Sequence, residues 1–107
     1  MRKPVHRRPE AIWDLIGHSG FIGQTDPAAA EDFLDHVDST FTQLADMPGV
    51  GGIWLIDPRR KTEIRWMSIR KFKKYLIFYV ETDKTVEVVR VLHASQNINT
   101  ILSSSLS

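Results

Sequence analysis

The chain has 107 residues, a formal net charge of +1 and no cysteine. This length suits one domain spanning 1–107, and the lack of cysteine excludes a disulfide framework and a cysteine-ligated metal site. No apolar run reaches the ~18 residues of a membrane-spanning helix, and the charged start MRKPVHRRPE lacks a following signal-type apolar core, so we expect a cytoplasmic protein without a membrane segment.

The charge is spread unevenly along the chain. Residues 1–52 carry four bases and eight acids, whereas residues 53–107 carry ten bases and five acids. This division indicates either two faces with different partners or two ordinary solvated surfaces.

The chain begins with a predicted edge strand and a predicted helix. KPVH is a candidate edge strand, because Pro4 lacks the N–H that a central strand needs. A helix follows in RPEAIWDLIGHSG, where Pro9 suits the first turn and Gly17 and Gly20 predict the end. Trp13 flanks its predicted buried face, which consists of apolar residues at helical spacing: Ile12, Leu15 and Ile16.

A second helix is predicted after Asp26, whose carboxylate can accept hydrogen bonds from the first-turn amides. Pro27 suits the first helical position, and Pro48 and Gly49 predict the stop. An apolar stripe predicts the buried face: Ala30, Phe33, Leu34, Val37, Phe41 and Leu44. Two helices joined by a short loop should form an antiparallel hairpin.

The pattern then changes to that of strands, which we predict at four places: 53–57, 63–69, 75–81 and 86–93. We interpret RKFKK as a basic connection and TDKT as a hairpin link. Strict alternation in the last strand predicts two faces, Val86, Val88, Arg90 and Leu92 on one and Glu87, Val89, Val91 and His93 on the other.

The end of the chain is expected to add little to the fold. Ile98, Ile101 and Leu102 predict one helical turn, and residues 103–107 a frayed tail. Helices followed by strands predict an α+β fold, with the N-terminal helical hairpin packed on a three- to four-stranded antiparallel sheet. The other face of that sheet would be partly open to a partner.

Candidate chemistry is sparse. The four histidines have no metal-ligand spacing, so we expect no metal and no cofactor, and we interpret His18 and His36 as surface residues. One constellation on the predicted sheet combines phosphate-binding and proton-transferring residue types: Arg65, Tyr75, Tyr79, Arg90 and His93. It would suit metal-free RNA cleavage, and it would equally suit cross-strand ion pairs with His93 as a structural residue at a strand end.

The segment RWMSIRKFKKYLIFYVETDKTVEVVRVLHASQNI resembles the C-terminal half of ParE toxins in the RelE/ParE superfamily. Upstream, the first helix resembles that of the family at Ala11, Asp14 and Leu15. The end of the second helix is similar at Phe41, Leu44, Pro48, Gly49 and Gly51. The resemblance covers nearly the whole chain.

The resemblance implies the toxin of a two-gene toxin–antitoxin module, held inactive by a cognate antitoxin, ParD-like or similar, whose tail wraps the toxin. It implies a hetero-oligomer that represses its own operon, with DNA contacted only through the antitoxin. ParE-like members are linked to poisoning of DNA gyrase, whereas RelE-like members cut messenger RNA on the ribosome. An inactive toxin relic is the third alternative.

The residues after His93 favour the non-nuclease, ParE-like branch, because ASQNINTILSSSLS has no base, tyrosine or histidine. Gln96 and Asn97 stand where the family often has an arginine–aspartate pair. If the chain were a nuclease, Arg65, Arg90 and His93 would be its working residues.

A partner tail that is both acidic and apolar is expected, because residues 59–74 concentrate eight bases. The predicted partner-binding residues are exposed aromatics and bases: Trp13, Trp54, Arg59, Arg60, Arg65, Trp66, Arg70, Lys71, Lys73 and Lys74.

Overall fold

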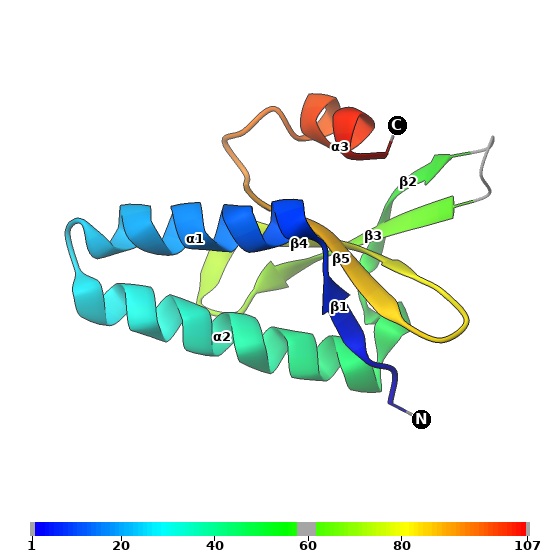
Figure 1. The fold of residues 1–107 in the computed structure, drawn as a ribbon, viewed down its shortest axis with the longest axis horizontal. Coiled ribbons are helices and arrows are strands. Elements are labelled where there is room, and N and C mark those ends of the chain that lie inside the picture. The colour runs from blue at the N-terminus through cyan, green and yellow to red at the C-terminus, as the bar shows by residue number, and fades with distance from the viewer. Residues whose placement is uncertain (1, 58–61, 107) are drawn as a thin grey trace.

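A computed structural model describes residues 2–57 and 62–106 and has an α+β fold (Figure 1). A hairpin of two helices, α1 (Pro9–Gly23) and α2 (Pro27–Asp46), covers one face of a sheet. A third helix, α3 (Ile98–Leu106), packs on the other face. No helix within the described ranges is both long and apolar enough to cross a bilayer.

The sheet has the strand order β1-β5-β4-β3-β2. Its strands are β1 (Val5–Arg7), β2 (Gly52–Asp57), β3 (Thr62–Ile69), β4 (Phe72–Glu81) and β5 (Val86–His93). The predicted α+β class is confirmed, but the sheet has five strands and is mixed, because β1 pairs in parallel with β5. Two main-chain hydrogen bonds flank this pairing, from the Val86 N–H to the Pro4 carbonyl (2.9 Å) and from the Arg8 N–H to the Val88 carbonyl (3.0 Å).

Helix α1 continues past Gly17 and Gly20 to Gly23, so the predicted end was wrong. A glycine inside a helix costs about 1 kcal/mol relative to alanine, which packing against α2 and β5 offsets here. Helix α2 is capped as predicted, since the Ala29 N–H donates to Asp26 Oδ1 (3.1 Å).

The buried face of α1 also differs from the prediction. Ala11 and Leu15 are buried, whereas Ile12 and Ile16 are 44% and 54% exposed. The inward face follows Ala11, Leu15 and the half-buried His18, each three or four residues apart. Apolar residues therefore lie on both sides of this helix, and spacing alone could not tell which side packs on the sheet.

The apolar stripe of α2 forms the centre of the core between the hairpin and the sheet. Phe33, Val37, Phe41 and Leu44 are buried as predicted, while Leu34 is 40% exposed. They pack against residues of β3, β4 and β5 in one cluster. The long α2 thereby fixes the hairpin on the sheet.

A β-bulge in β5 decides which side chains face each helix layer. Arg90 lies opposite Phe78 and Val88 lies opposite Tyr79, which leaves Val89 without an opposing residue. The extra residue shifts the alternation, so Val91 joins the core under the helical hairpin and Val89 joins Leu92 under α3. The predicted strict alternation is therefore wrong beyond Val88.

Two further segments depart from the sequence prediction. Strand β4 begins at Phe72, so the expected connection RKFKK shrinks to the two-residue turn Arg70–Lys71, with Lys71 at a left-handed φ of 72°. Such a turn matches the twist of the paired strands, which explains the positive φ. Helix α3 is longer than the single predicted turn, and its Leu102 is buried against the sheet.

Candidate functional site

Arg65, one of the three candidate nuclease residues, holds the loop that follows α2. Its Nη1 donates to the carbonyl of Gly51 (2.8 Å) and at longer range to that of Gly49 (3.4 Å). Its Nη2 donates to Glu63 Oε2 (3.3 Å). These contacts engage both terminal nitrogens of the guanidinium, so Arg65 has a structural role.

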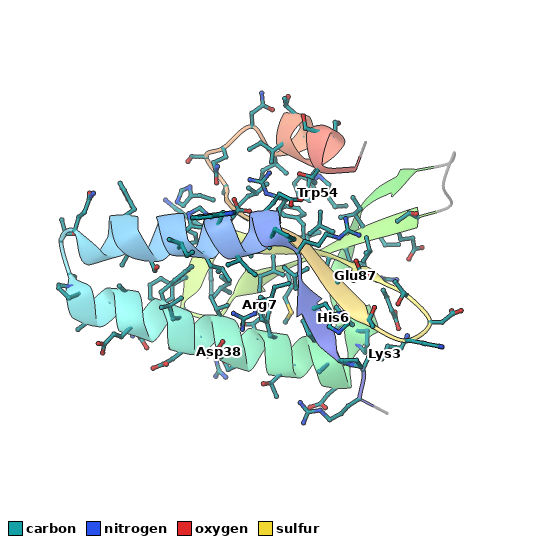
Figure 2. All side chains as sticks on the ribbon, viewed as in Figure 1. Lys3, His6, Arg7, Asp38, Trp54 and Glu87 are labelled. Carbon is teal, nitrogen blue, oxygen red and sulfur yellow. The ribbon has the colours of Figure 1, made fainter. Side chains whose placement is uncertain are left out.

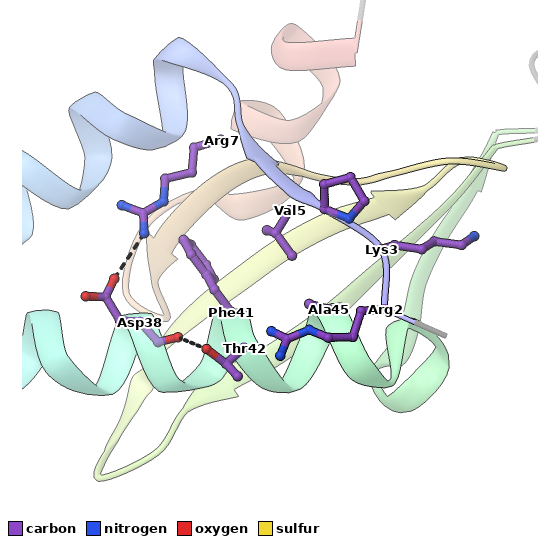
Figure 3. A pocket seen from close by; sticks show the side chains of 9 residues that line it. Arg2, Lys3, Val5, Arg7, Asp38, Phe41, Thr42 and Ala45 are labelled. Atoms are coloured by element: carbon purple, nitrogen blue, oxygen red, sulfur yellow. Dashed lines mark hydrogen bonds and ion pairs between the residues drawn. The ribbon is translucent and has the colours of Figure 1, made fainter.

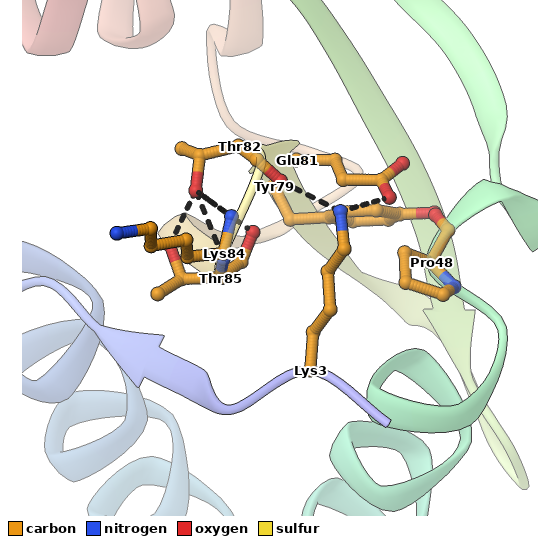
Figure 4. Close-up of polar contacts among 7 residues, drawn as sticks. All are labelled: Lys3, Pro48, Tyr79, Glu81, Thr82, Lys84 and Thr85. Atoms are coloured by element: carbon orange, nitrogen blue, oxygen red, sulfur yellow. Dashed lines mark hydrogen bonds and ion pairs between the residues drawn. The ribbon is translucent and has the colours of Figure 1, made fainter. Parts of the chain in front are cut away.

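Tyr79 lies opposite Arg65 in the sheet and holds the same loop. Its buried hydroxyl accepts from the Gly51 N–H (2.9 Å) and donates to the Pro48 carbonyl (2.8 Å), and Figure 4 shows the ring directed at Pro48. Burial raises the pKa of Tyr79, which keeps the phenol protonated as a donor. We call Arg65, Tyr79 and Gly51 with its flanking loop the loop latch.

Gly51 is required by the close packing of the loop latch. A Cβ at this position would lie 2.5 Å from both the Trp66 carbonyl oxygen and the Tyr79 hydroxyl. At Gly49, in the same loop, a Cβ would meet nothing within 4 Å. Steric crowding therefore requires a glycine at Gly51 but not at Gly49.

Arg90, the second candidate nuclease residue, ties β5 to two helices. Its Nε and Nη2 each donate to the Asp14 carboxylate of α1 at 2.7 Å, and Nη1 reaches Ser105 Oγ of α3 (3.3 Å). The Val91 N–H also donates to Asp14 (3.0 Å). The hydrogen bond to Asp14 raises the pKa of Arg90, so the guanidinium stays charged, and its charge is used in this ion pair.

His93, the third candidate, closes β5 with local contacts. Its Nδ1 accepts from the Ser95 N–H (3.1 Å) and lies 2.8 Å from Ser95 Oγ. Its main-chain N–H donates to Gln96 Oε1 (2.7 Å), and its ring packs edge-on against Tyr75, 4.8 Å between centroids. Gln96 thus serves to cap the strand end.

The sheet register keeps Arg65 and His93 apart. They lie opposite Tyr79 and Tyr75 of the same strand, two positions separated by about 13 Å. The guanidinium of Arg90 is bonded to Asp14 of α1. Within the described residues, the three candidate side chains are therefore held by different partners and are not gathered at one site.

A cleft next to His93 was not predicted. It has a volume of about 390 Å³, and six residues line it: His18, Phe21, Tyr75, His93, Ser95 and Gln96. We call it the aromatic cleft.

His18 is half-buried rather than a surface residue, with Nε2 bonded to the Val91 carbonyl (2.7 Å) and its ring 4.9 Å from that of Tyr75. The sequence signal for the inward position of His18 was its spacing from Ala11 and Leu15 along the helix.

Trp13 is the most exposed of the predicted partner-binding aromatics, at 71%. With Ile12 and Ile16 it forms an apolar surface, which we call the outer face of α1. Gly17 and Gly20 lie within the same helix and have open space around their Cβ positions. The outer face of α1 is thus an apolar surface that the glycines leave partly without side chains, and it has no packing partner among the described residues.

Trp54 and Trp66 have structural partners on the other side of the sheet. Trp54 lies below α3 in Figure 2, and its Nε1 donates to Asn99 Oδ1 of that helix (3.1 Å). Its ring lies edge-on to those of Trp66 and Phe78, 6.2 and 5.2 Å between centroids. Trp66 is partly buried and packs against the apolar cluster that contains Leu102 of α3.

Four predicted partner-binding bases gather around the β3–β4 turn, all exposed: Arg70, Lys71, Lys73 and Lys74. Lys71 bonds to Asp32 of α2, and this hydrogen bond lowers the pKa of that carboxyl. The other three form no ion pair within the described ranges. Arg59 and Arg60 lie outside the described residues.

A groove of about 530 Å³ runs between β1 and α2 (Figure 3). Arg7 lies over the Phe41 ring and pairs with Asp38 at 3.0 Å. Lys3, which also lines this groove, donates to the Glu81 carboxylate and to the Thr82 carbonyl, both at 2.7 Å (Figure 4). These contacts anchor the N-terminal arm.

No cluster of three or more histidine, cysteine or acidic residues that could hold a metal ion occurs in the described parts of the chain.

A family model described as ParE toxin of type II toxin-antitoxin system, parDE, matches residues 5–98. No curated protein matches the chain.

Proposed function

The chain belongs to the ParE toxins of type II toxin–antitoxin systems, and we propose that it acts by binding and poisoning DNA gyrase. We further propose that a cognate antitoxin, ParD-like or similar, holds it inactive in a hetero-oligomer in the cytoplasm. In this proposal the complex contacts DNA through the antitoxin alone.

The observation that carries the proposal is the structural use of the three candidate nuclease residues. Arg65 is bonded to the Gly51 carbonyl, Arg90 to Asp14, and His93 to Ser95. A general acid or base must come within about 3 Å of the proton that it transfers, and phosphate-stabilising cations must surround the same atoms. This dispersal favours a toxin that acts by binding over a RelE-type nuclease.

Expression of the chain without antitoxin is expected to arrest bacterial growth with an SOS response. A folded His93→Ala variant should remain fully toxic. If the chain were a ribosome-dependent nuclease, that variant would lose about 100-fold or more in messenger RNA cleavage. Arrest with cleaved messenger RNA and no DNA damage would contradict the proposal, and well-expressed folded protein without toxicity would indicate an inactive relic.

The outer face of α1 is the surface that we propose for the apolar part of the antitoxin tail. Trp13, Ile12 and Ile16 expose large side chains there, and the nearby glycines let a partner backbone approach closely. Aromatic side chains that become buried when a partner binds carry most of the binding energy in protein interfaces. The bases around the β3–β4 turn would attract acidic residues of the same tail.

Reversing the charge of Arg70 and Lys73 together, with Arg70→Glu and Lys73→Glu, is expected to slow antitoxin association about tenfold at low salt. Neither side chain is paired within the described residues, so their field is free to steer an acidic tail. Stopped-flow kinetics over a salt series would measure this. Lys84→Glu, in the exposed turn between β4 and β5, is the matched control, and a salt-independent association rate would contradict the expectation.

A further inference from the structure

We propose that the aromatic cleft binds a nucleobase. The base would come from a free nucleotide or from single-stranded nucleic acid. This inference goes beyond the proposed function and does not rest on gyrase or on an antitoxin.

The walls of the cleft are aromatic rings already held in place. Tyr75 lies edge-on between the rings of His18 and His93, at centroid distances of 4.9 and 4.8 Å, and Phe33 supports it from the core at 5.0 Å. Phe21 leaves 70% of its surface exposed at the rim. The volume of about 390 Å³ falls in the range of small-ligand clefts. Such rings provide stacking surfaces that need no rearrangement.

The hydrogen bonds around the cleft define which polar groups remain for a ligand. Because His93 Nδ1 accepts from the Ser95 N–H, the proton of the neutral ring sits on Nε2, which can donate. Because His18 Nε2 bonds to the Val91 carbonyl, it carries the proton, and Nδ1 can accept. Gln96 uses only its oxygen, so its amide group can donate.

The Tyr75 hydroxyl adds a fourth group and has no partner among the described residues. Burial raises the pKa of Tyr75, so this hydroxyl stays protonated and can both donate and accept. The cleft thus combines ring faces with two donors, one acceptor and one group of either kind.

This combination selects the ligand class. A purely apolar side chain from a partner would fill the volume but would leave these polar groups unpaired, at a free-energy cost for each. A nucleobase has a flat ring for stacking and an edge that carries donors and acceptors in one plane. It is therefore the more complementary occupant.

The test uses the full chain alone, titrated with nucleosides, nucleoside monophosphates and short single-stranded RNA and DNA. Ring signals of His18, Tyr75 and His93 should shift in NMR spectra on addition of nucleoside monophosphates. Phe21→Ala should weaken binding about tenfold, because one stacking surface is lost from an exposed position. Tyr75→Phe, which keeps the ring and removes the hydroxyl, should also weaken nucleotide binding. Met47→Ala, an exposed apolar residue in another loop, should leave affinity unchanged.

Tighter binding of oligonucleotides than of monophosphates would identify single-stranded nucleic acid as the source, and the reverse would identify the free nucleotide. The proposal is overturned if no nucleoside or nucleotide shifts these ring signals at about 10 mM, or if folded Phe21→Ala and Tyr75→Phe bind like the parent chain.

Discussion

Replacement of Gly51 by alanine is expected to lower the free energy of unfolding by about 2–4 kcal/mol. The added methyl would come within 2.5 Å of the Trp66 carbonyl oxygen, which belongs to a paired strand and cannot move aside. It would equally displace the Tyr79 hydroxyl, leaving a buried polar group without its partners. Chemical denaturation monitored by tryptophan fluorescence would measure the loss.

Gly49→Ala is the control from the same loop, because open space surrounds its Cβ position. It is expected to change stability by less than about 0.5 kcal/mol. Equal effects of the two substitutions would show that backbone freedom, and not the close approach at Gly51, explains the glycines of this loop.

Asp14→Ala is expected to destabilise the protein by about 3 kcal/mol. Asp14 and Arg90 keep only 11% and 20% of their side-chain surface exposed, so removal of the carboxylate leaves a half-buried guanidinium without its counter-ion. The Val91 N–H would also lose its acceptor. The pair joins α1 to β5, so the loss should appear in global unfolding.

A double-mutant cycle with Arg90→Leu would isolate the interaction, since the two losses should be strongly non-additive. Asp38→Ala removes a comparable pair with Arg7 in which Asp38 is 69% exposed, and it should cost less than about 1 kcal/mol. Additive effects of the Asp14 and Arg90 substitutions would contradict the account of this pair.

Sequence patterns correctly predicted those features of the helices and strands that depend on residues close together in the chain. The cap at Asp26, the buried stripe of α2 and the bounds of β5 needed only helical or strand periodicity and one carboxylate. The bulge at Val89 was not predictable in this way, because it depends on how two strands pair. Without it, the faces of β5 beyond Val88 could not be assigned.

The candidate site was harder to predict than the fold. Sequence pattern identified Arg65, Arg90 and His93 by residue type, but their partners depend on long-range contacts such as the one between Arg90 and Asp14. His18 was missed because the inward face of α1 was assigned to Ile12 and Ile16. The aromatic cleft exists only once α1, β4 and the end of β5 are together.

The most direct test of the central claim is DNA cleavage by purified gyrase in the presence of the purified chain. If the chain poisons gyrase, it should cause broken plasmid DNA to accumulate in a dose-dependent way, and His93→Ala should act like the parent chain. Unaltered gyrase activity, together with cutting of messenger RNA on ribosomes by the same preparation, would contradict the account.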